Sequence, residues 1–268
     1  MSTAVAKAKE TAVSTDVMDV MDDIFEFAGE GASFSSSEMQ IPFVRLLQAL
    51  SPQLNKKKAE YIEGAASGDA FNNVTNQYWD GEKGIKVIPC LTTIKYLEFV
   101  PRDLGGGFKG EIPPNSSVLQ KTTRSGSKEI LPNGNELVKS AQYFCFIVED
   151  DGNFQPVVID MKSTQLKVSK RWNSQISMQK MKNPKTGMLV QLPIFATMWR
   201  LYSVEESNDQ GSWNNWNVER IGLVEDQSLR LEAKAFRDSI MAGEVKAAPE
   251  DDGLGSTTQS NSDDEIPF

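Results

Sequence analysis

The sequence contains no histidine, and this absence removes several kinds of catalytic chemistry. It excludes an imidazole general base, a serine–histidine pair and the commonest metal ligand. Cys90 and Cys145 lie far apart in separate apolar runs, so we expect buried, reduced thiols rather than a metal or redox site. The sequence therefore predicts a protein that is not an enzyme, with no catalytic residue, no cofactor and no metal.

Long apolar runs are missing as well. No stretch of about 18 apolar residues occurs, so no membrane span is expected. Residues 1–9 hold two lysines with no apolar stretch behind them, which is unlike a secretory signal. We expect a cytoplasmic protein that does not associate with membranes.

Acidic residues are scarce in the middle of the chain and concentrated at its ends. Residues 1–40 carry two basic and eight acidic groups, and residues 244–268 carry one basic and seven acidic groups, so each end has a net charge of −6. Because the whole chain has a net charge of −9, residues 41–243 have a net charge of +3. A basic body between acidic ends is compatible with a nucleic-acid partner, although the average charge is acidic.

The composition predicts three parts. Residues 1–40 form an acidic arm with a short amphipathic helix over 15–29, and residues 41–243 form one folded body. Residues 244–268 have the composition of a disordered acidic tail.

The body is expected to be mainly β with inserted helices, an α+β fold. Two helices are predicted over 163–182 and 226–241, with Gly243 ending the second. Asp151-Gly152 predicts a tight turn between two strands. The predicted strands are 84–101, 141–148, 154–161, 192–204 and 216–224. Five strands with a helix among them favour a small barrel like the oligonucleotide-binding (OB) fold, or a curved antiparallel sheet.

The segment 161–204 has no aspartate or glutamate but holds eight basic residues interleaved with aromatic ones. Single-stranded DNA offers phosphates to cations and unstacked base faces to aromatic rings. The residues that we assign to DNA are Lys162, Lys167, Lys170, Arg171, Trp172, Lys180, Lys182, Lys185, Arg200 and Tyr202. Trp172 shares a helix face with Val168 and Ile176, so a place in the core is the alternative for it, and Tyr202 is the better stacking candidate.

The last six residues combine acids with large apolar side chains. Asp263, Asp264 and Glu265 can pair with basic residues around a partner's pocket, and Ile266-Pro267-Phe268 can enter it. A solubilising tail is the alternative, but it does not explain two large apolar residues at this place.

This tip resembles the C-terminal tip of bacterial single-stranded-DNA-binding proteins, with Glu265 where an aspartate is common. The resemblance implies docking of replication, recombination and repair proteins, and competition of the tip with DNA. The rest of the chain is unlike the bacterial family. Its layout is more similar to bacteriophage single-stranded-DNA-binding proteins, which implies the bacterial host cytoplasm as its compartment.

The sequence favours a sequence-independent binder of single-stranded DNA, but three other functions stay open. An annealing or recombination-mediator protein needs the same basic surface and self-assembly, and a homo-oligomer is compatible with either reading. A Mg²⁺-dependent nuclease would use Asp150 or Asp151 with Asp160 and Lys162. A decoy would display the tip to capture repair proteins without binding DNA.

Overall fold

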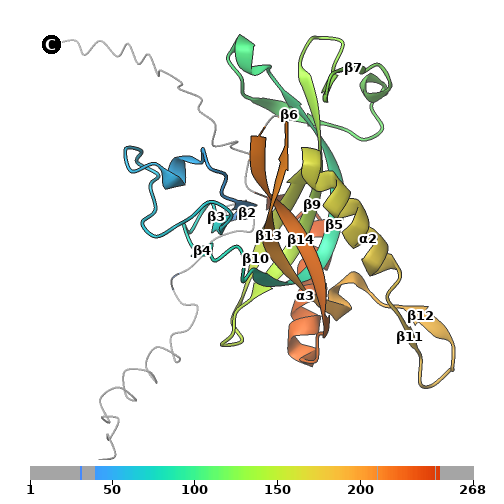
Figure 1. Cartoon of the computed structure of the whole chain (residues 1–268). Helices are drawn as coiled ribbons and strands as arrows, with labels where there is room; N and C mark the ends of the chain where they lie inside the picture. Colours follow the sequence, from blue (N-terminus) through green and yellow to red (C-terminus); the bar gives the residue numbers. More distant parts are fainter. Residues whose placement is uncertain (1–30, 32–39, 210, 245, 248–268) are drawn as a thin grey trace, which may run out of the picture.

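The computed structural model describes residues 31, 40–209, 211–244 and 246–247. The helix expected over 15–29 and the tip at 263–268 lie outside these residues. The described body is one strongly curled sheet with two helices (Figure 1), which confirms the predicted α+β class and curved, largely antiparallel sheet. Within the described residues, no helix is both long and apolar enough to cross a membrane.

The main sheet has eleven strands, eight of which follow one another across it. In spatial order these are β14 (Gly211–Leu223), β13 (Thr197–Asn208), β5 (Ile85–Phe99), β9 (Glu136–Val148), β10 (Phe154–Lys162), β2 (Phe43–Leu46), β3 (Ala70–Asn72) and β4 (Tyr78–Trp79). The remaining three are β6 (Phe108–Ile112), β7 (Thr123–Ser125) and β8 (Lys128–Ile130). Along the main path β10 and β2 are parallel and the other pairs antiparallel.

Two small sheets and the helices complete the fold. The sheets pair β1 (Gln40–Ile41) with β15 (Lys246–Ala247), and β11 (Lys180–Lys182) with β12 (Leu189–Gln191). The α-helices are α2 (Leu166–Ser177) and α3 (Gln227–Met241). The 3-10 turns are η1 (Pro52–Leu54), η2 (Arg102–Leu104), η3 (Ser117–Gln120), η4 (Ser163–Gln165) and η5 (Ile194–Ala196).

The two helices pack on opposite faces of the sheet, because neighbouring strand residues point to opposite sides. Val87 and Cys145 join the core that contains Val168 of α2. Their chain neighbours Ile88 and Phe146 join the core that contains Leu229 of α3. The sheet is therefore covered on both faces, and each helix has its own apolar layer beneath it.

Helix α2 is held by an aromatic cluster. Trp172 is completely buried, stacks on Tyr143 with ring centroids 4.3 Å apart, and meets Trp199 edge-on at 6.1 Å. The Tyr143 hydroxyl donates to Asn173 Oδ1 at 2.8 Å, and burial raises the pKa of Tyr143 to about 12. Trp172 is thus a core residue, and its assignment to DNA is wrong because no base can reach it.

The curled sheet is closed on one side by a side chain. Asn214 of β14 donates its backbone N–H to Gln48 Oε1 at 2.8 Å, and Gln48 Nε2 donates to the Asn214 carbonyl at 3.0 Å. The amide of Gln48 therefore takes the place of a neighbouring strand in the hydrogen-bond ladder. This pair of bonds brings the edge strand β14 next to the chain that follows β2.

Several predicted elements are confirmed. Residues 85–99 form one strand, and β9 and β10 meet at a turn where Gly152 has φ +90°. Helix α3 begins after Asp226, whose side chain accepts from the Ser228 N–H at 2.7 Å, and Gly243 follows its end with φ +76°. Cys90 and Cys145 are free and buried, and burial raises the pKa of Cys90 to about 12.

The single helix predicted over 163–182 is wrong. Helix α2 ends at Ser177, and the chain then forms the β11–β12 hairpin. The turn is made by Asn183, whose side chain accepts from the N–H of Lys185 at 2.8 Å, and by Gly187 with φ +72°. Lys180 and Lys182 therefore lie on a strand.

The strand predicted over 192–204 is also shifted. Leu192 and Pro193 lead into the 3-10 turn η5, so β13 starts only at Thr197 and then runs on to Asn208. Proline fixes φ and has no N–H for a ladder, which delays the strand.

We expect Trp172→Ala to lower the free energy of unfolding by about 3–5 kcal/mol, because it empties a packed aromatic core. Chemical denaturation monitored by circular dichroism measures this change. Lys170→Ala, at an exposed position of the same helix, is the control and should have little effect. A stable Trp172→Ala variant would contradict the core assignment.

Candidate nucleic-acid interface

Two cavities lie beside the edge strand β14, the first next to β2, β10 and η4 and the second next to α2 and β13. The first has a volume of about 220 Å³ and is lined by Arg45, Leu46, Asp160, Lys162, Gln165 and Trp216. The second has a volume of about 360 Å³ and is lined by Lys167, Val168, Arg171, Val204, Glu206, Trp216 and Asn217. Because Trp216 borders both, we treat them as one surface and call it the α2 groove.

The first cavity is built around a buried carboxylate. Asp160 lies on β10 with its side chain 4% exposed, and it pairs with Arg45 Nε at 3.3 Å and with Lys162 Nζ at 3.0 Å. Burial acts to raise the pKa of Asp160, but the charges of Lys162 and Arg45 outweigh it and hold the pKa below its usual value. Two cations around one carboxylate leave this end of the groove with a net positive charge.

The second cavity carries a row of polar contacts from α2 to β13 and β14. Lys167 Nζ donates to Glu206 Oε2 at 2.8 Å, and this hydrogen bond lowers the pKa of Glu206. Arg171 donates to Asn217 Oδ1, and Asn217 Nδ2 donates to the Tyr202 hydroxyl at 2.6 Å. The structure thus connects Arg171 and Tyr202, which are far apart in sequence.

Further cations continue beyond the groove. Lys170 is exposed on α2, and Lys180, Lys182 and Lys185 are exposed on the hairpin that follows the helix. No ion pair links these four lysines to another of the described residues. Their charges therefore remain available to a ligand.

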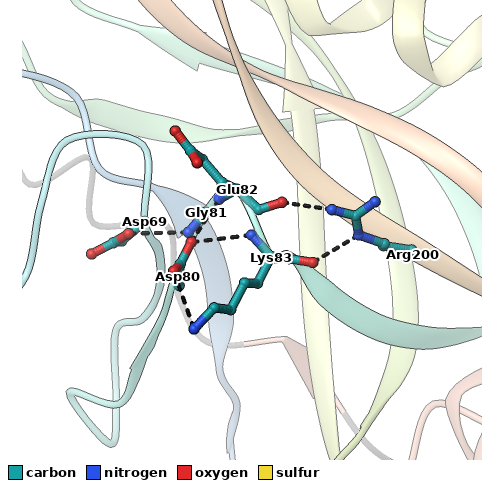
Figure 2. Close-up of polar contacts among 6 residues, drawn as sticks. All are labelled: Asp69, Asp80, Gly81, Glu82, Lys83 and Arg200. Atoms are coloured by element: carbon teal, nitrogen blue, oxygen red, sulfur yellow. Dashed lines mark hydrogen bonds and ion pairs between the residues drawn. The ribbon is translucent and has the colours of Figure 1, made fainter.

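Arg200 has a different role from the one that the sequence suggested. Its guanidinium donates to the carbonyls of Glu82 at 2.6 Å and Lys83 at 2.7 Å (Figure 2). It also pairs with Glu219 at 3.3 Å. Arg200 borders a separate cavity of about 330 Å³ beside Trp79. The structure therefore does not bring Arg200 into the α2 groove with Lys162, Lys167 and Arg171.

The loop that holds Arg200 is itself shaped by two aspartates. Asp69 Oδ1 accepts from the Gly81 N–H at 3.0 Å, and Asp80 Oδ1 accepts from the Lys83 N–H at 3.1 Å (Figure 2). At Gly81 an added Cβ would come within 1.9 Å of the Gly68 carbonyl oxygen, so a side chain is excluded there. These constraints fix the two carbonyls that receive the guanidinium.

Tyr202 lies between the two regions. Its ring is partly covered by the Arg200 guanidinium, 4.5 Å from the ring centroid, and its hydroxyl is bound to Asn217. One ring face is therefore occupied by the protein itself.

Most of the groove-lining residues were not among those assigned from the sequence, and these include Arg45, Trp216 and Asn217. For Arg45 a signal existed, because it interrupts the apolar run 41–50. The positions of Trp216 and Asn217 depend on how β14 pairs, so no local pattern identifies them.

The carboxylates of the nuclease alternative are not assembled. Asp150 lies in the β9–β10 turn and pairs with Lys86 at 2.5 Å, whereas Asp160 lies near the other end of β10. Because a β-strand rises about 3.3 Å per residue, Asp150 and Asp160 lie roughly 20 Å or more apart. In the part of the chain that the structure describes, no group of three or more potential metal ligands occurs.

A family model described as Pam3 phage gp34-like protein matches residues 8–246 of the chain. No curated protein matches the sequence. No solved structure matches it either.

We expect Asp160→Asn to lower the free energy of unfolding by about 1–3 kcal/mol at neutral pH, since it removes the buried charge that pairs with the half-buried Arg45 and Lys162. The pKa of Asp160 is depressed in the folded state. Its contribution to the free energy of unfolding is therefore complete at pH values above the ordinary pKa of 3.8 and is lost as the pH falls through the folded pKa.

Denaturation curves recorded at several pH values measure this difference. The gap between wild type and Asp160→Asn should narrow in acid, and a gap that stays constant down to the folded pKa would contradict the ion-pair account. Asp150→Asn removes an exposed partner of Lys86 and should leave the stability nearly unchanged.

Proposed function

The chain belongs to the Pam3 phage gp34-like protein family, and from this premise we propose that it is a sequence-independent single-stranded-DNA-binding protein. In this proposal an OB-like curled body coats the strand in replication, recombination and repair. The observation that carries it is the α2 groove, where four cations face two carboxylates. The family assignment supports a phage protein but does not specify a ligand.

The arrangement of the cations suits a flexible polyanion. Arg45 and Lys162 form a fixed positive end, and Lys167 and Arg171 stand at the groove's other end on α2. Lys170 on α2 and the three hairpin lysines, which have no ion-pair partner among the described residues, then add further positive charge. Phosphate contacts of this kind provide affinity that does not depend on base sequence.

Few aromatic faces are available to bases in this region. Trp172 and Trp199 are completely buried, which leaves Tyr202 as the remaining candidate among the assigned aromatic residues. We therefore expect electrostatic contacts to phosphates to contribute more to affinity than stacking does.

The proposal also assigns a role to the tail. Strands β1 and β15 pair, so the acidic arm and the acidic tail leave the body from neighbouring strands. We propose that Asp263, Asp264, Glu265, Ile266, Pro267 and Phe268 dock replication, recombination or repair proteins. We further propose that the acids of the tail compete with DNA for the cations of the body.

We expect the double variant Lys170→Ala/Arg171→Ala to weaken binding of an oligothymidylate. The slope of log affinity against log salt should become shallower by about 0.7 for each phosphate contact that is lost. Fluorescence anisotropy over a salt series measures both quantities.

The matched control is Lys234→Ala/Arg237→Ala, which removes two cations from α3 on the opposite face of the sheet. This control should leave the slope unchanged. Equal effects of the two double variants would argue against the α2 groove. Faster pairing of complementary strands by the wild-type chain would instead favour the annealing alternative.

We expect a chain that ends at Ala247 to bind single-stranded DNA more tightly than the full chain, most visibly at low salt, because six acidic side chains are removed. Truncation at this point keeps β15 paired with β1. Phe268→Ala keeps every side-chain charge, so its DNA affinity should equal that of the wild type. Unchanged affinity of the truncated chain would contradict competition by the tail.

A further inference from the structure

The β5–β6 hairpin carries a pair of aromatic rings at the edge of the sheet. Phe99 of β5 lies opposite Phe108 of β6, and their ring centroids are 5.5 Å apart with an interplanar angle of 54°. The two side chains differ in exposure, because Phe99 is 8% exposed and Phe108 is 41% exposed. Phe99 thus supports a second ring that is itself partly open to solvent.

A β-bulge brings this pair of rings together. Glu98 lies opposite Gly110, so in a regular antiparallel ladder the next pair would be Phe99 with Lys109. The register shifts at this point, and Phe108 lies opposite Phe99 instead. Because side chains alternate along a strand, the extra residue turns Phe108 onto the face that carries Phe99. Bulges are common next to binding sites, where they redirect a side chain in this way.

Lys162 connects the aromatic pair to the α2 groove. Its Nζ lies 5.8 Å from the centroid of the Phe99 ring, within the range of a cation–π contact, and 3.0 Å from Asp160 Oδ2. The same ammonium therefore belongs to the lining of the first cavity and to the surroundings of the two phenylalanines. A strand whose phosphate reaches Lys162 has the pair of rings directly beside that phosphate.

The backbone that leads to Phe108 leaves space for a ligand. Gly105, Gly106 and Gly107 precede it, and their φ angles lie between +68° and +112°. A Cβ added at Gly105 or Gly107 would meet no atom within 4 Å. Glycine lets a backbone come close to a ligand, and Lys109, the residue after Phe108, is exposed and adds a cation.

Exposure alone does not single out Phe108. Phe154 is 40% exposed and rests on Phe146, with ring centroids 4.7 Å apart. That pair lies on the α3 face of the sheet, where Phe146 also stacks on Phe236. Among the described residues, no cation–π contact involves Phe146 or Phe154. The neighbouring groove cation is therefore the feature that distinguishes Phe108 from an exposed ring elsewhere.

We propose that the Phe108 ring is a stacking platform for a base of the single-stranded DNA whose phosphates bind Lys162 and the rest of the α2 groove. This inference rests on the proposed function and adds a base contact to it, because Trp172 and Trp216 are buried. A nucleotide has an anionic phosphate and a flat base, and a cation beside an uncovered ring matches both parts. An aromatic ring stacks on any of the four bases, so the contact raises affinity without reading sequence.

An oligothymidylate and an abasic oligonucleotide of the same length separate stacking from phosphate binding, because both carry the same phosphates. We expect Phe108→Ala in the full-length chain to weaken binding of the oligothymidylate by about 5- to 100-fold, which is typical of the loss of one stacked base. Its affinity for the abasic strand and its salt slope should equal those of the wild type, since no charge is removed. Fluorescence anisotropy over a salt series measures these quantities.

Three further variants control this experiment. Phe108→Trp keeps an aromatic face and should retain the affinity for the oligothymidylate, whereas Phe108→Leu keeps only an apolar side chain and should lose it. Phe154→Ala is the matched control, because it removes a ring of nearly equal exposure from the α3 face. It should bind both strands as the wild type does.

Wild-type affinity of Phe108→Ala for the oligothymidylate, or an equal loss of affinity for both strands, would overturn the stacking platform and leave the proposed function intact. Failure of the wild-type chain to bind either strand would overturn both. If a second copy of the chain covers the ring instead, Phe108→Ala lowers the sedimentation coefficient of the protein without DNA, and that result also overturns the platform.

Discussion

The packing of Trp172 beneath α2 is the interaction on which the rest of the structure depends. The ring fills the space between Tyr143 and Trp199 on one face of the curled sheet, and this contact fixes the rotation of the helix. Because α2 is amphipathic, burying Trp172 turns Lys167, Lys170 and Arg171 outward. The β11–β12 hairpin follows directly on the helix that this contact holds.

Charge pairing then divides the basic residues into two groups. Asp160, Glu206 and Glu219 hold Arg45, Lys162, Lys167 and Arg200 in defined positions, and three of these four ion pairs line the α2 groove. The lysines at 170, 180, 182 and 185 extend the positive surface without such partners among the described residues. A fixed positive groove, continued by exposed lysines, is the physical basis of the proposed function.

Local patterns predicted the parts of this structure that depend on local chemistry. Apolar runs and the Asp151-Gly152 turn located β9 and β10, and Asp226 with Gly243 marked the ends of α3. The residues at 178–182 contain no helix breaker, so the hairpin could not be told from a longer helix. Its turn is set by the Asn183 side chain, and its second strand lies further along the chain.

The contacts of the candidate site depended on pairing between distant segments. Arg45 reaches Asp160 only because β2 lies parallel to β10, and Arg200 is held by a loop more than a hundred residues away in sequence. The segment 161–204 contains no acidic residue in sequence, but in the folded chain Glu219 of β14 pairs with its Arg200. Sequence therefore located the basic region, but it could not say which cations are already paired.

Hydrogen–deuterium exchange with and without an oligothymidylate tests the central claim most directly, that the α2 groove binds single-stranded DNA. The account predicts slower exchange in η4, α2 and the adjoining part of β14, with α3 on the opposite face unchanged. Protection confined to α3, or unchanged exchange along α2 at saturating oligonucleotide, would contradict it.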